Sequence, residues 1–202
     1  MAYMGTPFRD EKHSGNPQQI PGRVFCAYYD AGGDGIAYHT HDNLNNGSGI
    51  LNPENGSYLH SFRIGEGVST SYVKYYDEID NNQYNQVIPE KDMLYVGWTQ
   101  PGDWINLTVE VAESGVYSVS LLYTSRYGGR ISLSVDGNDT TGPLEIVTTF
   151  NENDPVDWRQ WHHWNCTVLT DIELSAGTHV LTIHTLENGN MNYGYLEFSL
   201  KQ

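Results

Sequence analysis

The feature that most constrains the fold of this chain is a series of short runs in which apolar and polar residues alternate. Within residues 104–111, the apolar positions Ile105, Leu107, Val109 and Val111 are separated by polar ones. A period of two is typical of a β-strand with one buried face. Similar runs occur at residues 117–123, 131–135, 181–183 and 195–200. We find no window with the pattern of an amphipathic helix of useful length.

Turn-forming residues separate these runs. Clusters of Gly, Asn, Asp and Ser lie at residues 113–115, 136–138, 175–177 and 188–190. Such residues favour tight turns because they tolerate left-handed backbone or bond to their own main chain. Many short strands joined by turns predict an all-β sandwich or barrel. A length of 202 residues suits one such domain. We expect a disordered or linker tail over residues 1–19 and one domain over residues 20–202.

The charge of the chain limits its partners. It has 25 acidic and 10 basic residues, for a formal net charge of −15. Nucleic acids and anionic membranes attract basic surfaces, so neither is an expected partner. No segment is apolar and long enough to predict membrane insertion. Residues 1–16 are polar and lack the pattern of a secretory signal sequence. Neutral glycans remain compatible with this charge.

Two long loops rich in Asn, Gly and Asp are expected at residues 42–57 and 77–92, and such loops commonly carry function. His39 and His41 could clip a metal, but the sequence places no third ligand beside them. The acidic loop also lacks the spacing of a helix-flanked calcium site. We therefore predict no metal site. The two cysteines, Cys26 and Cys166, permit one disulfide or two thiols.

Several short motifs follow one another along residues 20–200. They include Gly-Asp-Trp-Ile at 102–105 and Trp-Arg-Gln-Trp at 158–161. The others lie at residues 20–24, 28–30, 35–39, 66–68, 95–99, 128–129, 136–137, 176–179 and 192–198. Each motif is weak alone, but the ordered series resembles family 6 carbohydrate-binding modules. It also looks like modules in glycan-degrading proteins of Bacteroides-like bacteria.

The resemblance implies a two-sheet antiparallel β-sandwich, a jelly roll, with a sugar site in the loops at one end. In this family two aromatic rings sandwich the sugar and an Asn bonds to it. Matched by motif, the rings are Trp98 and Trp158, the Asn is Asn192, and Tyr38 forms an additional wall. A flat ring buries the apolar face of a pyranose, and Asn is both a donor and an acceptor.

Other aromatic residues of these motifs are predicted to have structural roles. Trp104 and Trp161 are expected in the core, because five Trp cannot all contact a ligand. His162 and His163 are adjacent and are expected in a strand, where they face opposite sides. We therefore predict a structural role for both histidines.

The sequence departs from the family at its structural calcium. The resemblance implies acidic residues on the first strand and one near the last strand. This chain has Phe25, Ala27 and Gly194 there. Calcium needs several oxygen ligands, commonly carboxylates. We therefore predict no cofactor, and an apolar patch in place of the calcium site.

The predicted function is non-catalytic binding of a polysaccharide or oligosaccharide. The resemblance implies a secreted or cell-surface monomer, extracellular or periplasmic, that targets an attached or partner glycoside hydrolase. One alternative is a structural or adhesion sandwich that has lost its sugar site. Another is a jelly-roll glycoside hydrolase or lyase, although no motif for paired catalytic carboxylates or a Gly-x-Ser-x-Gly elbow is found.

Overall fold

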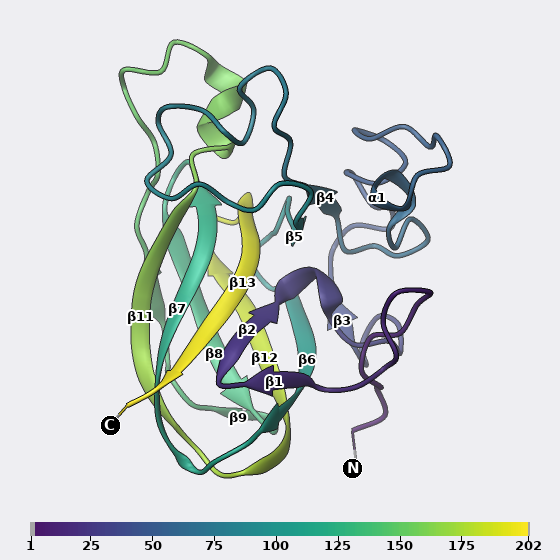
Figure 1. Cartoon of the computed structure of the whole chain (residues 1–202), viewed down its shortest axis with the longest axis vertical. Helices are drawn as coiled ribbons and strands as arrows, with labels where there is room; N and C mark the ends of the chain where they lie inside the picture. Colours follow the sequence, from purple (N-terminus) through teal and green to yellow (C-terminus); the bar gives the residue numbers. More distant parts are fainter. Residues whose placement is uncertain (1–2, 202) are drawn as a thin grey trace.

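Two β-sheets packed face to face make up most of the computed structural model, which describes residues 3–201 (Figure 1). The first sheet runs in the order β1 (Gln18–Ile20), β6 (Trp104–Val111), β12 (Gly177–Glu187), β8 (Gly129–Val135), β10 (Leu144–Ile146), with β3 (Tyr38–His39) on β6 and β9 (Asn138–Asp139) on β8. The second runs β11 (Asn165–Leu174), β7 (Gly115–Ser125), β13 (Met191–Leu200), β5 (Leu94–Val96), β4 (Thr70–Tyr72), with β2 (Gly22–Phe25) on β13. Pairing is antiparallel except between β1 and β6. The predicted two-sheet sandwich is confirmed.

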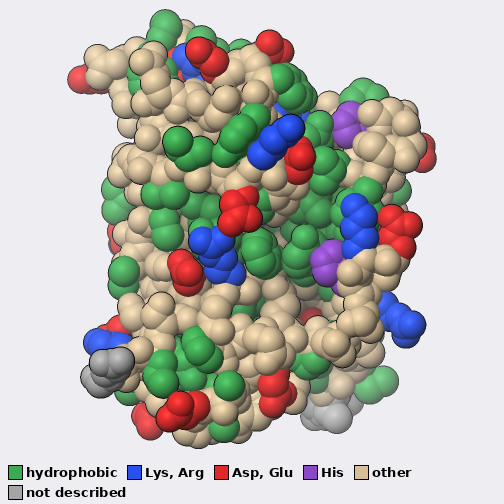
Figure 2. All heavy atoms as spheres, viewed as in Figure 1, with side chains coloured by type: hydrophobic (Ala, Val, Ile, Leu, Met, Phe, Trp, Pro, Cys, Tyr) green, Lys and Arg blue, Asp and Glu red, His purple; other side chains and the backbone are tan. Residues whose placement is uncertain are grey.

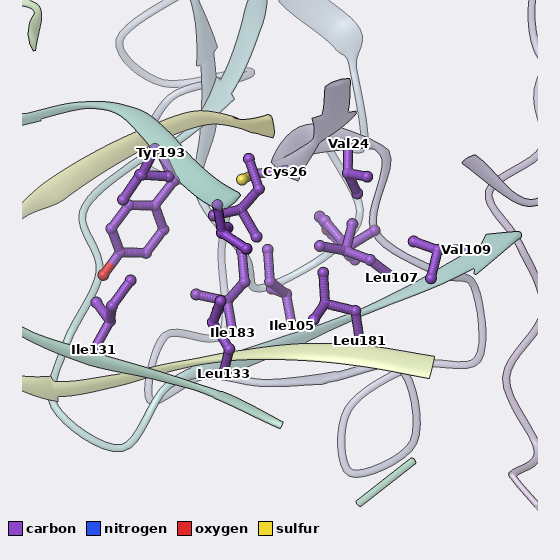
Figure 3. Close-up of a cluster of buried hydrophobic side chains, with 14 of the residues drawn as sticks. Val24, Cys26, Ile105, Leu107, Val109, Ile131, Leu133, Leu181, Ile183 and Tyr193 are labelled. Carbon is purple, nitrogen blue, oxygen red and sulfur yellow. The ribbon is translucent and has the colours of Figure 1, made fainter. Parts of the chain in front are cut away.

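The core lies between the sheets and is formed by the alternating apolar positions. Leu107, Val109, Leu133, Leu181 and Ile183 are at most 2% exposed. Figure 3 shows these side chains from the first sheet facing residues such as Cys26 and Tyr193 across the interior. Their polar neighbours along each strand point to the outer face, as a period of two requires.

One predicted turn shows how local sequence sets the register. Asp136 and Gly137 connect β8 to β9, and both have positive φ, 51° and 77°. Two central residues with positive φ form the hairpin turn whose twist matches that of paired strands. Asp136 also accepts a hydrogen bond from the Val180 backbone N–H at 2.9 Å. The turn is therefore fixed to the neighbouring β12.

The helical elements are short. They are η1 (Cys26–Tyr28), α1 (Tyr58–Ser61) and η2 (Asp157–Trp161). In Figure 1, η2 stands at the upper end of the sandwich, above β7 and the start of β13. The long loop at residues 73–93 lies beside it, since Asn82 donates a hydrogen bond to the His162 carbonyl at 3.0 Å. This end of the molecule is called the loop end below.

Residues 3–17 run along the sandwich. The Tyr3 hydroxyl donates to Asp30 at 2.7 Å, Thr6 pairs with Ala31, and the Phe8 ring stacks on Tyr28. The boundary between tail and domain at residues 19 and 20 stays a prediction.

The surface carries charges of both signs in small groups. In Figure 2, Lys and Arg side chains lie beside Asp and Glu, and hydrophobic side chains gather between the sandwich and the segment that carries α1. Cys26 and Cys166 are free thiols. Across residues 3–201, no helix has both the length and the hydropathy needed to span a membrane.

Candidate functional site

A pocket of about 420 Å³ opens at the loop end. Its lining residues are Leu51, Tyr95, Trp98, Trp158, Trp161, His162, Asn190 and Asn192. Three predicted site residues, Trp98, Trp158 and Asn192, therefore lie around one cavity although they come from distant parts of the chain. The lining includes several aromatic rings and no Asp, Glu, Lys or Arg. We call this cavity the loop-end pocket.

Trp98 lies two residues after the end of β5 and lines the pocket. Its φ is 52°, in the left-handed region that non-glycine residues seldom adopt. Such backbone costs roughly 1 kcal/mol or more and is common at functional sites. Two glycines make room for side chains of the pocket wall, Gly47 for the Trp98 ring and Gly97 for the Asn192 amide. A Cβ at Gly47 would lie 3.1 Å from Trp98 Cζ3, and one at Gly97 would lie 2.6 Å from Asn192 Oδ1.

Trp158 is the most open ring of the pocket, with 50% of its surface exposed. It is carried by η2, whose other aromatic side chain, Trp161, lies three residues later. Residues at i and i+3 share one side of a 3₁₀-helix. Trp161 was expected in the core, but it is half-buried and lines the pocket beside Trp158. The 3₁₀ turn is the reason for the difference, because the period of three replaces the alternation of a strand.

A buried ion pair anchors η2. Arg159 donates from Nε and Nη2 to the two carboxylate oxygens of Asp154, at 2.7 and 2.8 Å. His163 Nε2 lies 2.8 Å from the same carboxylate. These hydrogen bonds hold the pKa of Asp154 well below its usual range, and the bonds from Arg159 have the largest effect. A depressed pKa means that the carboxylate stabilises the fold above about pH 4 and loses this role only in strong acid.

A second arginine covers the outer side of η2. Arg126 makes a two-pronged contact with Asp157, from Nη2 to Oδ1 at 2.5 Å and from Nη1 to Oδ2 at 3.1 Å. Its guanidinium also lies 4.4 Å from the centre of the Trp161 ring. A cation over an indole face is attractive. Trp161 is therefore fixed between Arg126 and the pocket.

Asn192 forms the polar part of the wall at the start of β13 and is 7% exposed. Its Nδ2 donates to Thr124 Oγ1 at 2.9 Å and to the Trp161 carbonyl at 2.8 Å. These two bonds use both amide hydrogens. The carbonyl Oδ1 is the atom left to accept a hydrogen bond from a ligand.

Tyr38 lies outside this pocket. It is 6% exposed, belongs to the main core, and packs edge-on against the Tyr29 ring at 5.5 Å. Alternation along the two-residue β3 turns Tyr38 inward and leaves His39 partly exposed. The structure does not bring Tyr38 together with the other three predicted residues.

The three positions where the resemblance implies acidic residues are packed among apolar side chains. Phe25 contacts the rings of Tyr28 and Tyr195, each at 5.6 Å between centroids. Ala27 is fully buried in a cluster whose other buried members are Phe62, Tyr72 and Leu94. A Cβ at Gly194 would lie 3.0 Å from Met93 Cε and 3.1 Å from Leu122 Cδ2. We call Phe25, Ala27, Gly194 and these neighbours the Phe25 cluster.

The Phe25 cluster does not fit a calcium ion. Calcium takes six to eight oxygen ligands, and these three positions supply no side-chain oxygen. Throughout residues 3–201, no group of three or more His, Cys, Asp or Glu is arranged to hold a metal ion. His39 and His41 instead bond through Nδ1 to Asp34 and Asp103, each at 3.0 Å.

Sequence reasoning did not identify Leu51, Tyr95, Trp161, His162 and Asn190 as pocket residues. Asn190 precedes the motif that contains Asn192, and its position near Asn192 was the available signal. Leu51 belongs to the loop at residues 42–57, which carries none of the quoted motifs. Leu51 reaches the pocket wall because the loop returns to the cavity. The buried Asn45 fixes the conformation of this loop, since its Oδ1 accepts hydrogen bonds from the backbone N–H groups of Gly47, Ser48 and Thr70.

Comparisons with known proteins agree with this architecture. The model of the family "Carbohydrate binding module (family 6)" matches residues 76–200. No curated protein matches the chain at a significant level. Among solved structures, a β-1,3-glucan-binding family 6 module from Bacillus halodurans superposes with a TM-score of 0.53 at 15% identity, over 91% of this chain and 98% of that one.

Two further solved structures are much longer enzymes. A family 43 arabinoxylan arabinofuranohydrolase from Bacillus subtilis, in complex with cellotetraose, gives a TM-score of 0.56 at 15% identity, over 92% of this chain and 28% of the enzyme. A cycloisomaltooligosaccharide glucanotransferase from a Paenibacillus species gives 0.44 at 20% identity, over 56% of this chain and 15% of that one. The chain thus spans a small part of these enzymes. At 15% identity, the superpositions on the Bacillus halodurans module and on the arabinofuranohydrolase show the fold alone.

Proposed function

This chain belongs to the family 6 carbohydrate-binding modules, and we propose that it is a non-catalytic module that binds a polysaccharide or oligosaccharide in the loop-end pocket. In this proposal the rings of Trp98 and Trp158 contact the faces of one sugar residue. Asn192 Oδ1 accepts a hydrogen bond from a sugar hydroxyl. Tyr38 stays outside the site.

The observation that carries the proposal is a half-exposed Trp158 on a rigid support. An indole left in water loses the free energy that burial would provide, about 25 cal/mol per Å² of apolar surface. Here the helix beneath it is fixed by the buried Asp154–Arg159 pair, so the ring is held in place for a partner. A preordered aromatic ring loses little entropy on binding.

The chemistry of the pocket supports binding over hydrolysis. A glycoside hydrolase needs two carboxyl groups on either side of the scissile bond. The pocket lining contains no Asp or Glu, and the buried Asp80 and Asp154 are occupied with structural donors. The expected affinity is on the order of micromolar to millimolar, because an open pocket removes little surface from water.

We further propose that the module works as an accessory domain, which brings an attached or partner glycoside hydrolase to its glycan. The family identity supports this role, and the fold is found within a longer arabinofuranohydrolase. Secretion or surface display and a monomeric state belong to the same proposal. A module that acts on extracellular glycans has to reach them.

Affinity electrophoresis tests the proposal. Wild-type protein, Trp158→Ala and Tyr76→Ala are run in native gels that contain xylan, β-glucan, galactan or mannan. Tyr76 is a matched control because it is an aromatic residue of similar exposure, 53%, outside the pocket lining. One polysaccharide should retard the wild type and Tyr76→Ala, and should retard Trp158→Ala at least about tenfold less. Equal retardation of all three proteins contradicts the site, and no retardation at all favours an adhesion or scaffold role.

A further inference from the structure

A histidine that sequence reasoning assigned to the scaffold faces the same pocket. His162 follows η2 and lines the cavity together with Asn192. Its Nδ1 lies 2.8 Å from Asp80 Oδ1, and its ring meets the edge of Trp158 at 5.9 Å between centroids. Its side chain is 16% exposed. Within residues 3–201, the second ring nitrogen, Nε2, has no hydrogen-bond partner.

The surroundings of Asp80 fix which nitrogen of His162 carries the proton. The Asp80 side chain is fully buried, and it accepts hydrogen bonds from Trp164 Nε1 at 2.7 Å and from the Lys74 backbone N–H at 2.8 Å. A carboxylate that receives two N–H donors is an acceptor for its third partner as well. The neutral imidazole therefore keeps its hydrogen on Nδ1, and Nε2 offers a lone pair.

Resting on the proposed function, we infer that His162 Nε2 accepts a hydrogen bond from a hydroxyl of the bound sugar, and that Asp80 positions it to do so. The pocket then offers two acceptors, this nitrogen and Asn192 Oδ1, among apolar rings. Sugar hydroxyls donate to both atoms. The carboxylate of a uronic acid is itself an acceptor, so it repels both lone pairs and meets no Lys or Arg in the lining.

The inference therefore names a substrate class, which is a neutral glycan rather than a polyuronate. The net charge of −15 also favours a neutral glycan, because the negatively charged protein repels a polyanion at long range. Asp80 is a positioning residue in this account, since it contacts the imidazole and not the ligand.

Three variants separate the roles. His162→Phe keeps an aromatic ring and removes both nitrogens, whereas His162→Gln keeps a carbonyl that can accept a hydrogen bond. Asp80→Asn leaves the imidazole but removes the charge that fixes its tautomer. Isothermal titration with xylotetraose, cellotetraose, laminaritetraose, mannotetraose and oligogalacturonate gives the affinities. Each protein is titrated well below its own melting temperature, so that all are folded.

The expected result is binding of at least one neutral tetrasaccharide and none of the oligogalacturonate. His162→Phe should bind about three- to tenfold more weakly, which corresponds to one neutral hydrogen bond, and His162→Gln should recover part of this loss. Equal affinities of wild type and His162→Phe contradict the inference and leave the proposed function intact. Preferred binding of oligogalacturonate contradicts the inference as well. A wild type that binds none of the oligosaccharides contradicts both.

The tautomer provides a readout that needs no sugar. A long-range ¹H–¹⁵N correlation spectrum in slightly alkaline buffer distinguishes a protonated from an unprotonated ring nitrogen, and His162→Gln identifies the signal. The wild type should show the hydrogen on Nδ1, and Asp80→Asn should show a mixture of tautomers. A hydrogen on Nε2 in the wild type overturns the inference.

Discussion

The loop-end pocket and the Phe25 cluster use aromatic residues in opposite ways. At the pocket, Trp158 stays half-exposed above a buried hydrogen-bond network of Asp154, Arg159 and His163. In the Phe25 cluster, aromatic rings pack on one another and cover Ala27, where the resemblance implies an acidic residue. Polar groups thus support the exposed ring at the pocket, whereas apolar groups fill the place where the resemblance implies a calcium ion.

The difference indicates which positions serve binding and which serve stability. An exposed ring on a rigid support can be removed with little effect on folding, since it buries little surface. A buried residue in an apolar cluster cannot be changed without a loss of stability. Removal of the exposed Trp158 ring is therefore expected to change glycan binding and to leave the unfolding free energy nearly unchanged, whereas a substitution inside the Phe25 cluster is expected to do the reverse.

The largest effect is expected for Ala27→Glu, which places an acid where the resemblance to the family implies one. The carboxylate would be buried among Phe62, Tyr72 and Leu94 without a partner. Urea unfolding should show a loss of roughly 3–5 kcal/mol, since an unpaired buried charge is costly. Val168→Glu is the control, because Val168 is 67% exposed on β11 and should tolerate the charge. Equal stability of both variants would contradict the apolar packing at Ala27.

The second-largest effect is expected for Arg159→Met, which should lower both the unfolding free energy and the affinity for the glycan. It leaves Asp154 buried with one partner fewer, which is expected to cost about 3 kcal/mol in unfolding free energy. The loosened η2 should also weaken glycan binding, because it carries Trp158. Arg130→Met is the control. Arg130 pairs with the exposed Glu145 and Glu187, so this substitution should change the unfolding free energy and the affinity little. Full stability of Arg159→Met would show that the pair does not anchor η2.

A smaller effect, confined to binding, is expected for Gly97→Ala. The new Cβ would lie 2.6 Å from Asn192 Oδ1, so the amide has to shift away from its position in the pocket wall. The affinity for the retarding glycan, measured by isothermal titration, should fall about tenfold, equivalent to 1.4 kcal/mol. Gly65→Ala meets no atom within 4 Å and serves as the control. An unchanged affinity would argue against Asn192 as a ligand contact.

The smallest effect is expected from calcium. The Phe25 cluster offers no side-chain oxygen at its three family positions, so the ion has nothing to stabilise there. The melting temperature should agree within about 1 °C in EDTA and in millimolar calcium, because a ligand stabilises only the fold that binds it. A clear rise with calcium would place an ion on the folded protein and contradict this prediction.

The fold could be predicted from local patterns, whereas the full pocket could not. Alternation in β6 and β12 predicts the buried positions because a period of two fixes the face of each side chain. The motifs likewise predict Trp98, Trp158 and Asn192 as site residues, and the structure places them together. These features depend on residues close in sequence or on an ordered family pattern.

The missed residues depend on geometry that local patterns do not encode. Trp161 faces the pocket because residues 157–161 form a 3₁₀-helix and not a strand. His162 faces it because the distant Asp80 holds its ring, and Leu51 because a long loop returns to the cavity. Tyr38 belongs to a motif of the series, but its two-residue strand turns it into the core.

The most direct test of the central claim follows the five indole N–H signals of tryptophan during titration with the retarding glycan. Trp98, Trp158 and Trp161 line the loop-end pocket, whereas Trp104 lies in β6 and Trp164 is buried against Asp80. The signals of the three pocket residues should shift and those of Trp104 and Trp164 should stay. A shift of Trp104 with unchanged signals from the other four would place the ligand on the first sheet and contradict the proposed site.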